Sequence, residues 1–165
     1  RKAAKAADAE AAAREAEITA RRAAALEARL LSREASARAI EERQRDGVVI
    51  VAAYYGDVDA ALAAAARADG DGAHADDAVA DSAPGGEWLD VRIALQHAVA
   101  DSALRLPASS KRDLRGFAPV AAVAGSPCRL WVRYVLAGET CTVCVRDDEP
   151  LRIGVGMAPP SAGAR

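Results

Sequence analysis

The sequence predicts an α+β protein in which a long N-terminal α-helix precedes a small antiparallel β-sandwich-like domain. Three observations lead to this prediction. Residues 1–46 contain neither glycine nor proline and are rich in residues that favour helices. After this segment, apolar side chains recur at every second position, which is typical of half-buried strands. Glycine and proline residues separate these short apolar runs and indicate turns.

The predicted helix, residues 1–46, is built mainly from Ala, Glu, Arg and Lys. Its few large apolar residues are Ile18, Leu26, Leu30, Leu31 and Ile40. A heptad runs through some of them, but it also contains Arg33 and Ala37, whereas a strong coiled coil has sustained apolar residues. Two interpretations therefore stay open. The helix is a solvated strut, or it binds a partner or forms a coiled coil through a stripe of four residues: Ile18, Leu26, Leu30 and Ile40. We expect Gly47 to end it.

Residues 47–154 are predicted to form the β-rich domain. The apolar run from Val48 to Tyr55 is typical of a strand that is buried on both faces. Further strands are predicted at 88–96, 103–106, 129–136, 140–146 and 150–153. The turn signal around Gly138 predicts that two of these strands form a β-hairpin.

Two segments of this region have compositions that bury little apolar surface. Residues 57–87 are rich in Ala, Asp and Gly, and we expect a mobile insertion loop with a helical turn near 60–68. Residues 155–165 are expected to form a flexible tail.

Composition and charge exclude several classes of function. The net charge is −2, so no basic field argues for a nucleic-acid partner. There is no run of about 18 strongly apolar residues, so we expect no transmembrane segment in this sequence. Three cysteines, an odd number, do not resemble a disulfide framework and favour a reducing compartment.

The candidate metal-binding and catalytic residues are few. Cys141 and Cys144 form a CxxC motif, but on a strand residues three apart point to opposite faces, so we expect packing cysteines. His74 lies in the predicted loop and His97 at the end of a predicted strand, and both are expected to be surface or structural residues. Nucleophile elbows and phosphate-binding loops are missing from the sequence. We therefore expect no catalytic, cofactor-binding or metal-binding residues, and no enzyme.

Three sequence blocks, in order, match a family pattern. They are residues 47–56 (GVVIVAAYYG), residues 89–106 (LDVRIALQHAVADSALRL) and residues 130–153, which contain LWVRYVLAG and DDEPLRI. Between the last two lie Ser110-Lys111 and Gly116-Phe117. Together they resemble the C-terminal domain of the DnaJ homolog subfamily C member 11 family, over roughly residues 47–153. The charged helix before them also fits that family.

This resemblance implies a J-protein whose J domain lies upstream of the present chain. It also implies a location at mitochondrial membranes and a non-catalytic scaffolding role in cristae organisation, with a mitochondrial membrane-organising complex as the partner. The chain itself has no His-Pro-Asp tripeptide, so we do not expect it to stimulate a heat-shock ATPase. Two alternatives remain: a helix-plus-β adaptor subunit of another large assembly, and a small-ligand-binding β domain.

Overall fold

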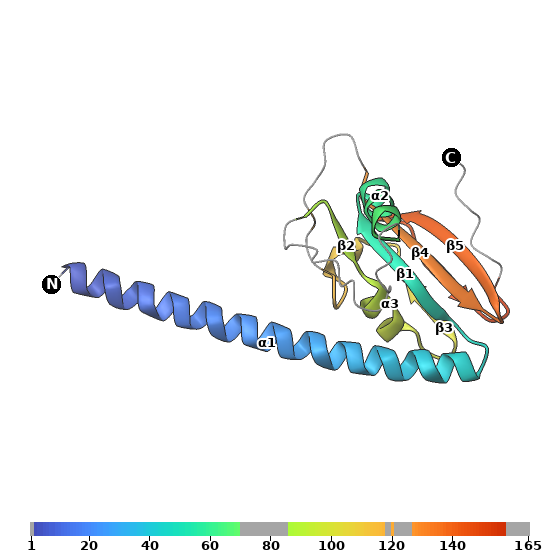
Figure 1. Cartoon of the computed structure of the whole chain (residues 1–165), viewed down its shortest axis with the longest axis horizontal. Helices are drawn as coiled ribbons and strands as arrows, with labels where there is room; N and C mark the ends of the chain where they lie inside the picture. Colours follow the sequence, from blue (N-terminus) through green and yellow to red (C-terminus); the bar gives the residue numbers. More distant parts are fainter. Residues whose placement is uncertain (1, 70–85, 118–119, 121–126, 158–165) are drawn as a thin grey trace.

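The computed structural model describes residues 2–69, 86–117, 120 and 127–157. The elements, in chain order, are α1 (Lys2–Gln44), β1 (Val49–Gly56), α2 (Val58–Asp69), β2 (Trp88–Asp90), α3 (Arg92–Ala98), β3 (Ala103–Leu106), a 3-10 turn (Lys111–Asp113), β4 (Arg129–Leu136), β5 (Glu139–Arg146) and β6 (Leu151–Gly154). Figure 1 shows α1 running along one side of a small domain that contains all the other elements. The predicted α+β class is confirmed.

The strands form two antiparallel sheets. The larger sheet has four strands in the order β2-β1-β4-β5, and β3 pairs with β6 in a separate two-stranded sheet. The predicted hairpin is confirmed, since Leu136 pairs with Glu139 across the two-residue turn Ala137-Gly138. Both turn residues have positive φ, 52° and 80°, as the favoured two-residue hairpin turns require.

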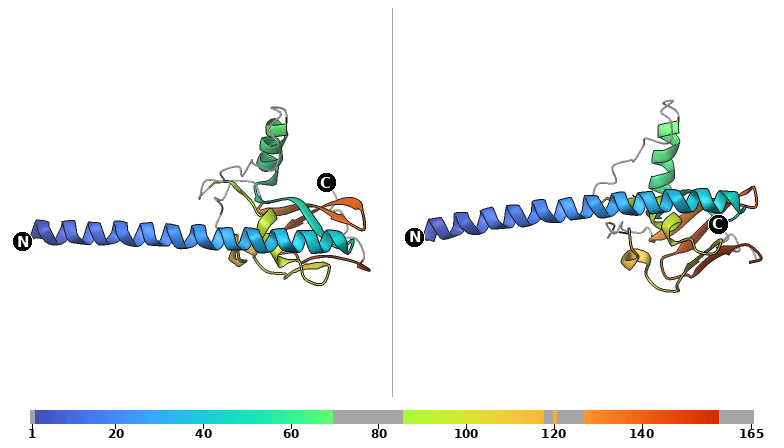
Figure 2. Two further views of the ribbon diagram at one scale, coloured as in Figure 1. Left: turned by 60° about the horizontal axis from the view of Figure 1, so that its bottom comes forward. Right: turned by 90° about the horizontal axis from the view of Figure 1, so that it is seen from below.

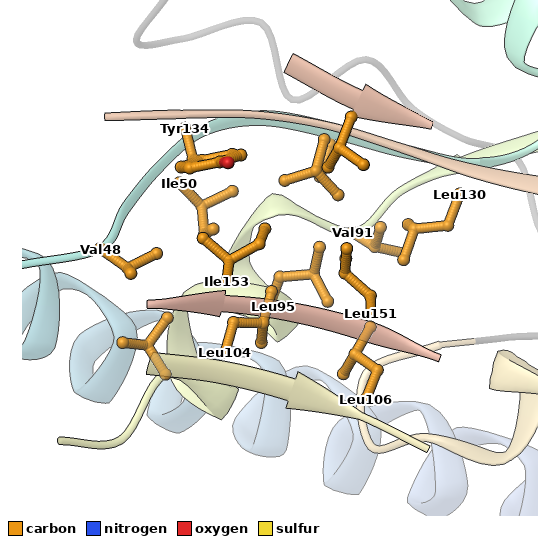
Figure 3. Packing of buried hydrophobic residues seen from close by; sticks show 14 of the residues in the cluster. Val48, Ile50, Val91, Leu95, Leu104, Leu106, Leu130, Tyr134, Leu151 and Ile153 are labelled. Carbon is orange, nitrogen blue, oxygen red and sulfur yellow. The ribbon is translucent and has the colours of Figure 1, made fainter. Parts of the chain in front are cut away.

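The hydrophobic core lies between the two sheets, with α3 closing one side. Figure 3 shows side chains from β1 and β4 meeting those from β3 and β6, while Val91 and Leu95 fill the space next to α3. Tyr55, Leu104, Leu130 and Leu151 are among the largest fully buried side chains. One contiguous cluster thus unites residues that are about 100 positions apart in the sequence.

The C-terminal part of α1 packs on α3, and the rest of the helix continues past the domain. Both views in Figure 2 show this projection. Leu31 and Ala35 are buried at the contact, 7% and 4% exposed. The Cα of Gly116 lies so close to this contact that an added Cβ would be 3.1 Å from a Leu31 methyl group. The apolar part of this contact is therefore small.

The end of α1 differs from the prediction that Gly47 stops the helix. The residue in the left-handed conformation is Asp46, with φ 53°. The Gly47 N–H donates to the carbonyl of Glu42, 2.8 Å away, and closes the last turn. A Cβ at Gly47 would lie 1.9 Å from the Glu42 carboxylate, so a larger residue would displace this carboxylate from its hydrogen bond to Val48.

The predicted strand at 88–96 is wrong beyond Asp90, because the chain turns into α3. Val91 and Leu95 are four residues apart, and this spacing fits one face of a helix as well as alternate positions of a strand. The Asp90 carboxylate accepts a hydrogen bond from the Arg92 N–H, 2.9 Å away, and favours the helical start. The Gln96 side chain of α3 accepts a hydrogen bond from the N–H of Ile50, 2.7 Å away, and ties this helix to β1.

The helical turn predicted near 60–68 is confirmed, but it is longer than expected: residues 58–69 form α2, a helix of 12 residues, so the predicted loop at 57–87 is wrong over this part. The Asp57 carboxylate accepts hydrogen bonds from the N–H groups of Asp59 and Ala60, both 3.1 Å away, which is the usual cap at a helix start. The remaining part of the predicted loop, 70–85, lies outside the described residues, as does the tail from 158 onward.

The strand β1 is not buried along both of its faces as predicted. Val51 is 45% exposed. The register with β4 shifts between Ile50 and Ala52, so a bulge displaces Val51 from the regular alternation.

Candidate functional site

The four residues that the sequence singled out for partner binding all lie on α1 and are exposed. The exposed fractions are 49% for Ile18, 60% for Leu26, 48% for Leu30 and 56% for Ile40. Most of the other large aliphatic side chains among the described residues are buried or packed against the core. We call these four residues the apolar stripe of α1.

The apolar stripe lies on the side of α1 that faces away from the domain. At 3.6 residues per turn, Leu26, Leu30 and Ile40 fall within about a third of the helix circumference. The buried residues Leu31 and Ala35 are one turn apart and lie on the other side of the helix.

Ala35, like Leu31, is buried against the domain, and it lies opposite Leu26 around the helix axis, as Leu31 lies opposite Ile40. Docking on the domain therefore leaves the stripe uncovered.

Polar contacts fix the rotation of α1 about its own axis. The Arg38 guanidinium donates to the backbone carbonyls of His97 and Val99 at the end of α3, where carbonyl groups have no helical partner. Glu34 pairs with the His97 ring, Oε2 to Nε2 2.8 Å. Because these contacts lie on the face of α1 next to α3, the helix cannot turn its stripe inward without breaking them.

Two further contacts act at either end of the docked segment. The Glu42 carboxylate accepts a hydrogen bond from the Val48 N–H, 3.1 Å away. Glu27 pairs with Arg115, 3.3 Å apart, and both side chains are more than half exposed. The first contact is buried and rigid, whereas an exposed pair such as the second contributes little.

A second candidate site is centred on a buried lysine. Lys111 is 0% exposed. Its Nζ donates to three backbone carbonyls of the turn between β5 and β6, those of Arg146 at 3.1 Å, Asp147 at 2.5 Å and Glu149 at 2.7 Å. An ammonium has three N–H donors, so all of them are used. Lys111 thus holds this turn against the loop that follows β3.

Asp147 joins the same cluster through its carboxylate. Its Oδ1 accepts from the Lys111 N–H at 2.9 Å and from the Tyr55 hydroxyl at 2.7 Å. Burial alone would raise the pKa of Asp147, but these hydrogen bonds and the Lys111 charge lower it below its ordinary value overall. Burial lowers the pKa of Lys111, and the nearby carboxylates oppose that shift.

The cluster is bounded by an aromatic pair and a thiol. Phe117 packs edge-on against Tyr55, with ring centroids 5.2 Å apart. Burial is the main cause that raises the pKa of Tyr55, and contacts with Cys128 and Asp147 raise it further. Burial likewise raises the pKa of Cys128, which disfavours a thiolate nucleophile. The polar groups of this cluster hydrogen-bond to one another and to the turn between β5 and β6, and in this way they hold these segments together.

Sequence reasoning did not find this lysine cluster. The only signal was that Ser110-Lys111 and the segment from Asp147 both match the family pattern. The structure places these two segments in contact.

The remaining predicted residues are placed as follows. Cys141 packs against the core, while Cys144 lies opposite Trp131 on the other face of the sheet. His97 belongs to α3, so its predicted place at the end of a strand is wrong. His74 lies outside the described residues. That these cysteines and histidines bind no metal stays a prediction.

Two structural features concern ligand binding and membrane insertion. The groove between α1 and α3, lined by Ser36, Arg92 and Gln96 among others, has a volume of about 90 Å³. Pockets for small ligands are typically about 300–1,000 Å³.

Within the described part of the chain, none of the helices has the length and apolar character needed to cross a bilayer.

Comparison with known families decides the assignment. The family described as DnaJ-like protein C11, C-terminal, matches residues 9–154. The chain belongs to this family. The match begins within α1 and ends at the last residue of β6, so it includes most of the helix as well as the whole described β domain. No curated protein and no solved structure matches the chain.

Proposed function

We propose that this chain is a non-catalytic scaffolding and protein-interaction domain of a J-protein associated with mitochondrial membranes and cristae organisation. In this proposal the two sheets form a sandwich-like platform, and the long helix α1 projects from it to reach a partner. The full-length protein would be located at mitochondrial membranes, and the direct partner would belong to the complex that organises them.

The observation that supports the proposal most strongly is the apolar stripe of α1. Leu26 and Ile40 are more than half exposed although the same helix buries Leu31 only a few residues away. Exposing several large aliphatic side chains on one face of a rigid helix favours a partner that covers them. Membership of the DnaJ-like C11 family supports a role in protein assembly.

The experiment is a pull-down from mitochondrial extract with the wild-type chain and the double variant Leu26→Ala, Leu30→Ala. A fully buried leucine contributes about 1.5–3 kcal/mol, so the variant should bind its partner at least about tenfold more weakly. The matched control is Val51→Ala, Val155→Ala, which removes exposed apolar groups from the domain instead.

We expect the control to recover the same membrane-organising proteins as the wild type and the stripe variant to lose them. Equal recovery by both variants would show that the stripe is not the docking element. Recovery of no mitochondrial membrane-organising protein by the wild type would contradict the family-based role.

A further inference from the structure

Charged residues flank the apolar stripe in a regular pattern. Along one side they are all acidic: Glu27, Glu34 and Glu41, each seven residues apart. Along the other side they are basic at three of four heptad positions: Arg22, Arg29 and Arg43, with Ser36 at the fourth. All seven of these residues are exposed. One edge of the stripe is therefore negative and the other is positive.

This arrangement corresponds to a heptad in which three residues of the stripe, Leu26, Leu30 and Ile40, lie in the seam, while Ile18 falls at a c position outside it. Leu26 and Ile40 take d positions and Leu30 an a position, with Ala23 and Ala37 at the other a positions. The acidic residues then occupy e and the basic residues occupy g. These are the positions whose side chains form ion pairs between the two helices of a coiled coil.

We infer that a second copy of this chain covers the apolar stripe, with the two α1 helices parallel and in register. In a parallel pair each g residue faces the e residue five positions later on the other helix. Arg22 then faces Glu27 of the second copy, and Arg29 faces Glu34. Opposite charges meet at both places, and the twofold symmetry doubles each pair.

The antiparallel arrangement is disfavoured by the same charges. There g faces g and e faces e, so arginines would meet arginines and glutamates would meet glutamates. Like charges across a helix pair destabilise it. The orientation is thus determined by the charge pattern of one helix.

The domain does not obstruct this pairing. Leu31 and Ala35 attach the domain to the face of α1 that lies away from the stripe. Glu27 and Glu34 each contact the domain but are 62% and 56% exposed, so their carboxylates can accept a second partner.

Arg33 is the charged residue within the seam, at a d position. Two arginines facing each other weaken the pair, but a single polar seam residue also fixes the register and the number of helices. We therefore expect a modest dimer that can be strengthened at this residue.

The inference rests on the proposed function in that it uses the same stripe: the second copy covers it, and the membrane-organising partner would bind the paired helices. Its test uses the purified wild-type chain in sedimentation equilibrium, so it does not depend on any mitochondrial component. We expect a monomer–dimer equilibrium below about 100 μM, which corresponds to modest affinity. Arg33→Leu should tighten the dimer by about tenfold, because it restores an apolar seam residue. A folding defect would not produce that gain.

The double variant Arg22→Glu, Arg29→Glu tests the orientation. It should weaken the dimer by about tenfold or more, because four attractive pairs become repulsive. The variant Arg112→Glu, Arg152→Glu changes the net charge equally but lies on the domain surface, and it should dimerise as the wild type does.

Three outcomes would overturn the inference. The wild type and Arg33→Leu both stay monomeric through about 100 μM, or the Arg22→Glu, Arg29→Glu variant dimerises unchanged, or the domain-surface control weakens the dimer equally. A monomeric chain that still loses its mitochondrial partners on Leu26→Ala, Leu30→Ala would refute the second copy and leave the proposed function standing. A dimeric chain that recovers no such partner would support the second copy and contradict the proposed function.

Discussion

The β domain buries a charge, and the helix α1 exposes apolar side chains. Each region departs from the usual distribution of residues, in which lysines lie outside and leucines inside. In the domain the departure is compensated within the chain, since three carbonyls surround the Lys111 ammonium. On α1 nothing in the described chain compensates Leu26 or Leu30. The buried Lys111 therefore stabilises the fold, whereas the exposed leucines of α1 leave a surface open for association.

The largest effect that would sharpen this comparison is expected from Lys111→Met. The change keeps much of the side-chain volume but leaves three carbonyls of the β5–β6 turn without their donor. We expect the free energy of unfolding to fall by about 3–5 kcal/mol, as when one partner is removed from a buried ionic site. Urea denaturation followed by tryptophan fluorescence measures the change.

Arg112→Met is the control, because Arg112 is the exposed neighbour in the same 3-10 turn. It should change stability by less than about 0.5 kcal/mol. Equal losses in the two variants would mean that Lys111 is no more important than a surface residue.

The comparison also explains which parts of the fold the sequence could predict. The β4–β5 hairpin was predictable because alternation and turn residues are local signals, and the register follows from them. The helix α3 was not, because Val91 and Leu95 fit both periods over so short a segment. Among the contacts of the helical form is the hydrogen bond from the Ile50 N–H to Gln96, which is 46 residues away in sequence.

The two sites differ in the same way. The stripe of α1 was predictable, because spacing along a single helix determines which face each residue occupies. The burial of Lys111 was not, because its acceptors lie 35 to 38 residues later and meet it only in the folded chain. Lysine in isolation predicts an exposed residue.

A smaller effect is expected at Asp147, which joins the lysine to Tyr55. Its pKa is lower in the folded chain than the ordinary value of 3.8. Its stabilising contribution is therefore present above pH 3.8 and disappears as the pH falls through the folded-state pKa. Asp147→Asn should lower stability near neutral pH by about 1–2 kcal/mol and should flatten this acid dependence.

Urea denaturation at several acidic pH values provides the measurement. Asp148→Asn is the matched control, since that side chain is 77% exposed and pairs with Arg146 at 3.8 Å. It should keep the wild-type pH profile. If Asp147→Asn keeps that profile as well, Asp147 does not link the buried lysine to the acid sensitivity of the fold.

The smallest effect should come from the stripe itself. Leu26→Ala, Leu30→Ala removes apolar groups that are about half exposed in the folded chain, so little burial is lost. We expect the free energy of unfolding of the domain to change by less than about 0.5 kcal/mol. The measurement must use a protein concentration at which the chain is monomeric, because dimerisation would add stability by mass action. Leu31→Ala, one residue away on the buried face, is the positive control and should cost about 2 kcal/mol or more. A large loss of unfolding free energy in the stripe variant would mean that these leucines already pack within the monomer. The contrast between a domain that satisfies its buried lysine and a helix that leaves its leucines exposed would then be wrong.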